Sequence, residues 1–347
     1  MAGSSEARAS RRRLTLAYAL YCLVVFAVVF GVAEGLARWR GATAWDPRPA
    51  PLSVTPGERL YRADPALGYG MLPGRFTVRF PTGDAFRLTN GDDSLRRSRP
   101  AAQTPEPEAP ALWIFGCSFS YGWGVDDEDV YAWQLQEALP RWAVTNFSVN
   151  GYGTLQSLLQ LEKALAERPA PAVVVLAYAG FHDARNTFLR ERRKRVAPFS
   201  ALGPLVQPFA RLGPEGRLQI EMADVTYREW PGIRWSALAH TAEQRWNEWE
   251  GRQVDSALIT EVIVERFVRT ARAGGARVIV AGIAGRFERV LANAQAAGAE
   301  PLVLAVDLSA PGMRNPPPDA HPSPKAHQRY AYRLLRAVKA NGRPAAP

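Results

Sequence analysis

The sequence predicts an α/β fold: a three-layer α/β/α sandwich with a central parallel sheet of about five strands, preceded by an N-terminal transmembrane helix. Three observations predict it. Short apolar runs alternate with longer segments whose apolar residues recur at helical spacing. The run at 172–178 is apolar at every position, so both faces of this strand must be covered, as they are in a parallel sheet between helices. Residues 14–33 are almost wholly apolar.

The alternation assigns the elements of the sheet domain in order. The expected strands cover 112–115, 143–149, 172–178, 277–283 and 302–306. The expected helices cover 130–139, 155–166, 256–272, 287–297 and 324–339. Ligands of such sheets bind at the carboxyl ends of the strands. We expect the loops that carry Ser118, Gly151, His182 and His321 to converge there.

The apolar segment 14–33 has about the twenty residues that a helix needs to cross the hydrocarbon core of a bilayer. Arg8 and the cluster 11–13 precede it, whereas Arg38 and Arg40 follow it. The heavier positive cluster lies on the N-terminal side, which favours a cytoplasmic N-terminus and an exported body. The catalytic part would then be periplasmic or exposed at the cell surface, held at the cytoplasmic membrane by one span.

We therefore expect residues 1–13 to be cytoplasmic and residues 14–36 to form the anchor. A cleaved signal peptide is the main alternative, because the small residues Ala33, Gly35 and Ala37 would suit a signal peptidase. The apolar run is longer than the usual core of a signal peptide, which favours the anchor. A buried helix of a soluble protein is the remaining alternative.

Residues 37–110 are expected to form a tether and an accessory β-hairpin. The tether, 41–58, is rich in Pro, Ala and Gly. Two strand-like pieces, 76–80 and 85–88, flank a Pro-Thr-Gly-Asp turn and predict the hairpin. A Pro-rich linker at 99–110 leads into the main domain.

The main domain is expected to cover 111–340, with a tail at 341–347 and an insertion at about 187–253 that interrupts the alternation. The insertion begins with an arginine-rich cluster at 190–195. Its tryptophans are Trp230, Trp235, Trp246 and Trp249. They either form a lid or cleft wall on which sugar rings stack, or pack the insertion onto the body. We favour packing, because aromatic residues supply much of any small core.

Composition excludes several classes of function. The net charge is +10, but the arginines are spread along the chain and no nucleic-acid-binding motif accompanies them, so we expect no nucleic-acid partner. Cys22 lies in the apolar segment and Cys117 in the main domain, so a disulfide between them is not expected. The four histidines lack zinc-site spacing, and we expect no metal and no cofactor.

The candidate chemistry lies in two short motifs far apart in the chain. Gly116-Cys117-Ser118 follows the first predicted strand, and Asp319-Ala320-His321 precedes the last predicted helix. A serine hydroxyl is a weak nucleophile that needs a base, and the base needs an orienting acid. The two motifs supply all three groups.

Over about 111–340 the chain resembles the SGNH (GDSL-type) hydrolases, a family with a flavodoxin-like sandwich. The segment 116–125 matches the nucleophile block with Ser118 in place, although Cys117 replaces the usual Asp. The segment 146–154 matches the second block, which makes Gly151 an oxyanion donor. The final block makes His321 the base and Asp319 its orienter.

The third block departs from the family. The resemblance implies Gly-x-Asn-Asp, whose Asn donates to the oxyanion, but this chain has His182 at that position. A histidine ring N–H can donate, so His182 is our candidate for the donor, with a structural role paired to Asp183 as the alternative. Loss of such a donor typically costs about 2.7–4 kcal/mol of transition-state stabilisation. Asn150 is a second nearby amide that would compensate.

The resemblance implies an esterase that removes acyl groups, acetyl above all, from an envelope or exported glycan, as membrane-anchored bacterial members related to polysaccharide O-acetyl esterases do. An O-acyltransferase with the same triad, in which a sugar hydroxyl replaces water, is one alternative. A catalytically silent protein that binds a glycan or a partner is another, motivated by the altered third block. The sequence leaves the oligomeric state open.

Overall fold

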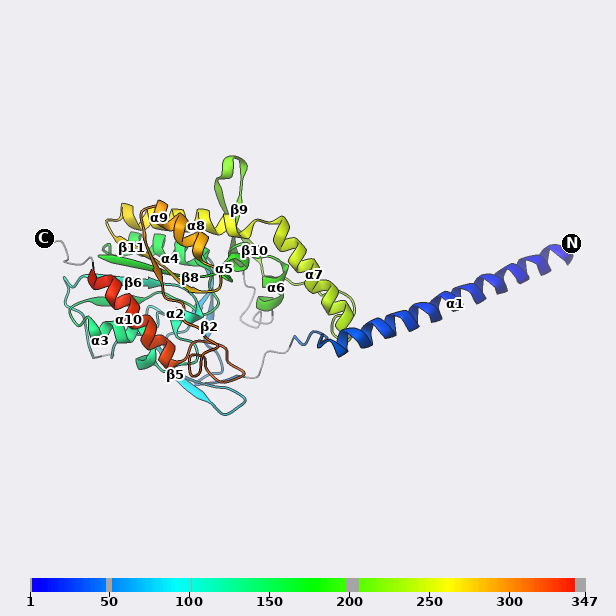
Figure 1. The fold of residues 1–347 in the computed structure, drawn as a ribbon, viewed down its shortest axis with the longest axis horizontal. Coiled ribbons are helices and arrows are strands. Elements are labelled where there is room, and N and C mark those ends of the chain that lie inside the picture. Colours follow the sequence, from blue (N-terminus) through cyan, green and yellow to red (C-terminus); the bar gives the residue numbers. More distant parts are fainter. Residues whose placement is uncertain (1, 48–51, 101, 198–205, 341–347) are drawn as a thin grey trace. The chain divides into compact units, whose positions relative to one another are not determined.

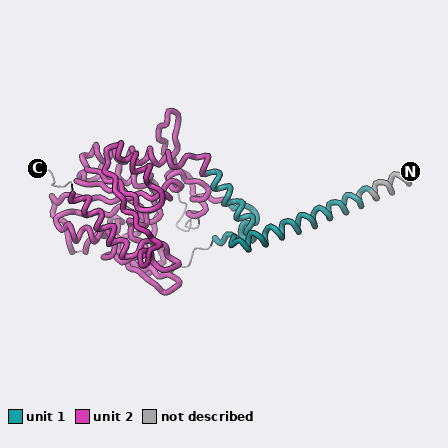
Figure 2. Tube along the Cα trace, in the orientation of Figure 1, with its two compact units in different colours: residues 1–47, 228–250 teal, residues 48–227, 251–347 magenta. Residues whose placement is uncertain are grey.

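The computed structural model describes residues 2–47, 52–100, 102–197 and 206–340 of the 347-residue chain (Figure 1). The chain divides into two compact units (Figure 2). Unit 1 comprises residues 1–47 and 228–250, and unit 2 comprises residues 48–227 and 251–347.

Unit 2 is built on a five-stranded parallel sheet of order β12-β11-β8-β6-β7. The strands are β6 (Ala111–Phe115), β7 (Ala143–Asn146), β8 (Val173–Ala179), β11 (Arg277–Ala284) and β12 (Glu300–Val303). The predicted parallel sheet of about five strands is therefore confirmed. The second strand ends at Asn146 rather than at Val149. Beyond Asn146 the backbone N–H of Phe147 still donates to the carbonyl of Ile114, and that of Val149 donates to the carbonyl of Gly116.

Helices cover both faces of this sheet. The helices that pack against the sheet are α3 (Tyr131–Ala138), α4 (Thr154–Glu167), α8 (Ser256–Ala273), α9 (Glu288–Ala296) and α10 (Pro324–Ala340). Along β6, Trp113 and Phe115 join one core cluster with α4, α8 and α9, whereas Leu112 and Ile114 join another with α3 and α10 (Figure 1). Successive side chains of a strand point to opposite faces, which gives the three layers.

Helix α8 illustrates why these segments are helical. Its buried residues recur at helical spacing, among them Ile259, Ile263 and Phe267. The carboxylate of Asp255 caps its first turn by accepting the backbone N–H of Leu258 at 3.0 Å. Full burial of each such apolar side chain contributes about 1.5–3 kcal/mol. The apolar stripe holds α8 against the sheet.

The segment before β6 folds into two small antiparallel sheets. One contains β1 (Ser53–Thr55), β4 (Gly74–Arg79) and β5 (Ala85–Asn90), and the other contains β2 (Tyr61–Asp64) and β3 (Gly68–Met71). The hairpin of β4 and β5 lies at the predicted position and pairs Val78 with Phe86. It shares a core cluster with Tyr121 and Trp123, which follow the nucleophile motif. The accessory region therefore forms part of the surroundings of the site.

Two short helices flank the carboxyl ends of the strands, and the predicted insertion follows the second. They are α2 (Ser118–Tyr121) and α5 (His182–Asn186). The insertion holds α6 (Arg190–Val196), the hairpin of β9 (Val206–Leu212) and β10 (Leu218–Asp224), and α7 (Ala237–Gln253). Residues 228–250, which hold the four tryptophans, belong to unit 1, so the packing of these tryptophans onto the α/β unit stays a prediction.

Unit 1 joins the N-terminal helix α1 (Ala2–Trp39) to residues 228–250. Residues Arg13–Trp39 form a helix long and apolar enough to cross a membrane, as the segment 14–36 predicted. Near its end, the Glu34 carboxylate accepts hydrogen bonds from the Ser236 hydroxyl and from the backbone N–H groups of Ala237 and Leu238. It therefore caps α7. The ring of Trp246 contacts the rings of Trp230 and Trp249, and Trp235 is exposed.

Candidate active site

Ser118 begins a short helix directly after β6. Cys117 is extended and fully buried, as expected for a small packed residue, and the helix ends at Gly122 with φ of +84°. A Cβ on Gly116 would lie 2.8 Å from the Ser120 hydroxyl, so glycine permits the tight turn. This sharp turn between strand and helix presents the buried Ser118 hydroxyl at the carboxyl edge of the sheet.

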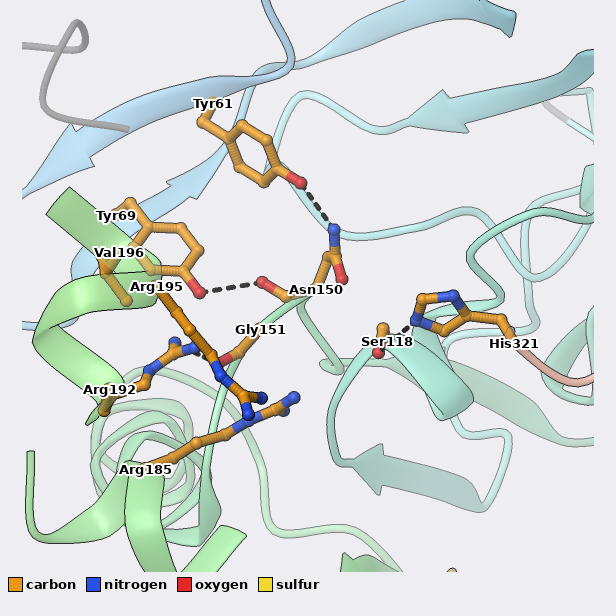
Figure 3. Close-up of a pocket in the computed structure, with 10 residues that line it drawn as sticks. All are labelled: Tyr61, Tyr69, Ser118, Asn150, Gly151, Arg185, Arg192, Arg195, Val196 and His321. Atoms are coloured by element: carbon orange, nitrogen blue, oxygen red, sulfur yellow. Dashed lines mark hydrogen bonds between the residues drawn. The ribbon is translucent and has the colours of Figure 1, made fainter. Parts of the chain in front are cut away.

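The structure brings Ser118 together with His321, 203 positions away in the sequence. The Nε2 atom of His321 lies 3.0 Å from the Ser118 hydroxyl oxygen, and its Nδ1 atom lies 2.5 Å from Oδ1 of Asp319 (Figure 3 shows the Ser118–His321 contact). A carboxylate only accepts hydrogen bonds, so Nδ1 donates and Nε2 is left to accept from the hydroxyl. The three groups thus form one continuous hydrogen-bond chain.

Asp319 is held from both sides. Its Oδ1 also accepts the backbone N–H of His321 at 3.3 Å, and its Oδ2 accepts the side-chain amide of Asn315 at 2.8 Å. Burial alone would raise the pKa of Asp319, but the hydrogen bonds from His321 and Asn315 lower it below its usual value. The carboxylate is therefore ionised at neutral pH and oriented toward the imidazole.

Gly124 and Asn315 support the acid, and sequence reasoning assigned a role to neither. The Asn315 amide also donates to the backbone carbonyl of Gly124 at 3.1 Å. A Cβ on Gly124, whose φ is +82°, would lie 2.2 Å from Oδ2 of Asp319. The close approach requires glycine at this position. The sequence signal that could have indicated a contact between Asn315 and the acid is their separation of four residues.

Two backbone N–H groups of the cavity-lining residues Ser118 and Gly151 have no acceptor among the described residues. Ser118 and Gly151 line the same cavity. Within the described ranges, neither backbone N–H donates to another part of the chain. Gly151 has a φ of +85°, which favours glycine. Backbone N–H groups without an internal acceptor are the usual donors to an oxyanion in sites that activate a serine.

His182 lies at the start of α5 and is fully buried, and it does not line the cavity. Its Nδ1 atom is 3.2 Å from the Thr154 hydroxyl, and its Nε2 atom has no hydrogen-bond partner in the described part of the chain. Burial and the charges of Arg185 and Arg192 hold its pKa well below the usual value, so the ring is neutral. Asp183, the alternative partner, accepts the Tyr178 hydroxyl instead.

Asn150 lines the cavity, but its side chain is already engaged. Its Nδ2 atom donates to the Tyr61 hydroxyl at 2.6 Å, and its backbone carbonyl accepts the Tyr69 hydroxyl at 2.9 Å (Figure 3). One of the two amide hydrogens is therefore committed to Tyr61. The contacts tie the second motif to the accessory sheet of β2 and β3.

The cavity has a volume of about 240 Å³. Several of the residues that line it were not predicted from the sequence to belong to the site. They are Tyr61, Tyr69, Arg185, Arg192, Arg195 and Val196. The arginines come from the cluster that begins the insertion and from the helix before it. A run of basic residues indicates a solvated surface more often than a pocket. The arginine cluster at 190–195 follows closely after the third motif, and this position could have indicated that it lies near the site.

No family model matches the chain, and no curated protein matches it. Similar solved structures include TesA, with 18% identity and a TM-score of 0.40 over 66% of this chain and 98% of that one. The esterase EstA from Pseudoalteromonas sp. has 12% identity and a TM-score of 0.40 over 66% and 97% of the two chains. A GDSL-family lipolytic protein from Veillonella parvula has 10% identity and a TM-score of 0.39 over 67% and 100%.

Proposed function

We propose that unit 2 is a serine ester hydrolase of the SGNH type. The observation that carries the proposal is the hydrogen-bond chain from the Ser118 hydroxyl through His321 to Asp319, which opens into a cavity. A base 3.0 Å from a serine hydroxyl and held by an ionised carboxylate is the arrangement that activates serine for acyl transfer.

The reaction follows from this geometry. The Ser118 oxygen attacks the carbonyl carbon of the ester while its proton passes to Nε2 of His321. The bond to the alcohol breaks, and His321 returns the proton to the departing oxygen. Water then attacks the acyl carbon while His321 takes its proton, the bond to the Ser118 oxygen breaks, and His321 returns the proton to that oxygen as the acid leaves. Asp319 keeps Nδ1 protonated and stabilises the imidazolium in both halves.

The negative charge that develops on the carbonyl oxygen needs donors fixed in advance. The backbone N–H groups of Ser118 and Gly151 are two of them. We propose Nε2 of His182 as the third, although its ring is fully buried and does not line the cavity, so substrate binding would have to bring the oxyanion within its reach. The Thr154 hydroxyl can donate to Nδ1 of the neutral ring, which leaves the hydrogen on Nε2, the atom with no partner within the described residues.

The substrate that we propose is an acyl ester, acetyl above all, on an envelope or exported glycan. The cavity volume of about 240 Å³ accommodates a small acyl group and part of a sugar ring, and Tyr61 and Tyr69 offer aromatic and hydroxyl surfaces. The apolar helix Arg13–Trp39 would hold the enzyme at the cytoplasmic membrane, with the catalytic unit outside.

Labelling with a fluorophosphonate tests the nucleophile without the natural substrate. The full chain in detergent should be labelled, and the Ser118→Ala variant should not. Ser120→Ala is the matched control, because it removes another buried hydroxyl from the same short helix and should still be labelled. Equal labelling of wild type and Ser118→Ala would refute the proposal.

Turnover of an aryl acetate, with and without an oligosaccharide acceptor, then separates hydrolysis from transfer. We expect release of acetate to water to dominate in both conditions. If acetylation of the acceptor exceeded hydrolysis, the chain would be an O-acyltransferase with the same triad. Absence of Ser118-dependent turnover, together with retained glycan binding, would identify a catalytically silent binding protein.

A further inference from the structure

One side of the catalytic cavity is lined by three arginines. Arg185 comes from α5, and Arg192 and Arg195 come from α6. Figure 3 shows the side chains of Arg185 and Arg195 extended from these helices toward the side where Ser118 lies. Among the described residues that line the cavity there is no carboxylate, so its wall carries only positive charge.

These charges are poorly compensated by the protein. Arg185 donates to the backbone carbonyl of Tyr152 at 2.7 Å and lies over the Phe181 ring, and Arg192 donates to the carbonyl of Gly151 at 2.6 Å. Neither guanidinium pairs with an acid within the described residues. The Nε of Arg192 is buried there without a hydrogen-bond partner.

Only Arg195 of the three has a carboxylate partner, Glu191, one turn earlier on the exposed side of α6. The neighbouring residues 198–205 contain no acidic side chain. Burial and the charge of Arg185 lower the pKa of Arg192 to about 10, which leaves it protonated at neutral pH. Like charges gathered around a cavity repel one another until an anion enters. A guanidinium also binds carboxylates and phosphates through paired, charge-assisted hydrogen bonds.

We propose that the cavity selects an acylated sugar that carries a negative charge, a carboxylate or a phosphate, and that Arg185, Arg192 and Arg195 bind this charge while the ester lies at Ser118. The inference rests on the proposed ester hydrolysis and names the substrate class for that site. The contact of Arg192 with the carbonyl of Gly151 would couple the bound anion to the loop that holds the oxyanion.

A matched pair of esters tests the selection. The full chain in detergent is assayed with 4-acetoxybenzoate and with its neutral methyl ester, and the ratio of the two kcat/KM values is the readout. We expect wild type to prefer the anionic ester at least about tenfold, the effect of one good charge-assisted hydrogen bond. In Arg185→Gln and Arg195→Gln the ratio should fall toward one.

Arg217→Gln is the control, because it removes the same charge from an exposed side chain outside the cavity and should leave the ratio unchanged. Arg192 is left out of this assay, because its loss would release the carbonyl of Gly151 itself. Arg185→Gln releases the carbonyl of Tyr152, so Arg195→Gln, which within the described residues loses an ion pair with the Glu191 side chain, provides the independent check. A wild-type ratio near one, or a high ratio that neither substitution lowers, would overturn the inference while Ser118-dependent turnover still supported the proposed function.

Binding supplies a readout that does not depend on turnover. The Ser118→Ala chain is titrated calorimetrically with glucose, glucuronate and glucose 6-phosphate, which differ only at carbon 6. We expect glucuronate or glucose 6-phosphate to bind at least about tenfold tighter than glucose, and Arg185→Gln in the same background to remove the difference. The tighter of the two identifies carboxylate or phosphate. Equal binding of all three sugars would refute the selection of anions even if both esters proved inert.

Discussion

The side-chain amide of Asn315 donates to Oδ2 of Asp319 at 2.8 Å, while His321 occupies Oδ1 of the same carboxylate. The acid is therefore fixed by two neighbours that contact different oxygens. Asn315 does not line the cavity at Ser118 and contacts Asp319, so for the proposed reaction we expect it to act as a positioning residue. Such outer contacts determine how well a base is oriented.

Replacement of Asn315 by Leu should lower kcat for an aryl acetate by about 10–100-fold with little change in KM, because the carboxylate loses its second support. Asn315→Asp should lower it further, since a second carboxylate would lie against Asp319 and raise its pKa. Steady-state kinetics measure both. A change in KM alone would show that Asn315 contacts the substrate instead.

Gly124→Ala should disable the site and destabilise unit 2, because the added methyl group would lie 2.2 Å from Oδ2 of Asp319. Gly216→Ala is the matched control. Its φ of +70° imposes the same backbone strain, of about 1–2 kcal/mol, but a Cβ there meets nothing within 4 Å. Kinetics and urea unfolding should separate the two. Equal activity in both variants would contradict the packing of Gly124 against the acid.

His182→Ala should lower kcat for an aryl acetate by about 10²–10³-fold, the effect of losing one oxyanion donor. His182→Asn restores the amide of the family motif and should recover at least part of that loss. A packing role would give a different result: both variants would unfold more readily, and kcat in the folded fraction would stay at the wild-type value.

His327 should make stability depend on pH. Burial and the charge of Arg96 lower its pKa to about 3, whereas an unfolded histidine titrates near pH 6.5, at about the reference value. The stability from this neutral ring is complete above that pH and is lost as the pH falls toward 3, by up to about 1.4 kcal/mol per pH unit.

The variant His327→Gln removes this titration. Wild type should lose more unfolding free energy than the variant between about pH 7 and pH 4.5, as measured by urea titration at the two pH values. The buried ring accepts the backbone N–H of Tyr131 at 3.3 Å, a bond that the Gln side chain can replace. Parallel losses in wild type and variant would show that His327 does not titrate as proposed.

The sequence was sufficient to predict the sheet and the proximity of Ser118, His321 and Asp319, because both depend on local signals. The apolar run at 172–178 is long enough to indicate burial on both faces, and β8, which covers 173–179, has every residue buried. The motifs at Ser118 and His321 follow or precede elements whose periodicity is clear. Parallel strands bring such loops to one edge of the sheet, whatever their separation in the chain.

The residues that the sequence did not reveal are those whose role depends on tertiary packing. Tyr61 and Tyr69 belong to an accessory segment whose position against the site no local pattern specifies. Arg192 and Arg195 lie in a basic run, which has the same composition whether it faces solvent or a cavity. The division of the insertion between the two units likewise depends on the contacts of Glu34, which is distant in sequence.

If the apolar helix crosses a bilayer, the hydrogen bonds that Glu34 accepts from Ser236, Ala237 and Leu238 limit how deeply it can enter. A carboxylate with these hydrogen-bond partners belongs in the headgroup region, so the hydrocarbon layer would have to end before Glu34. The stretch from Leu14 to Ala33 then spans about 30 Å, the thickness of that layer. A deeper position of the helix would bring the start of α7 into the hydrocarbon layer, because Glu34 is hydrogen-bonded to it. Glu34 and these partners would therefore fix how far the helix enters the membrane.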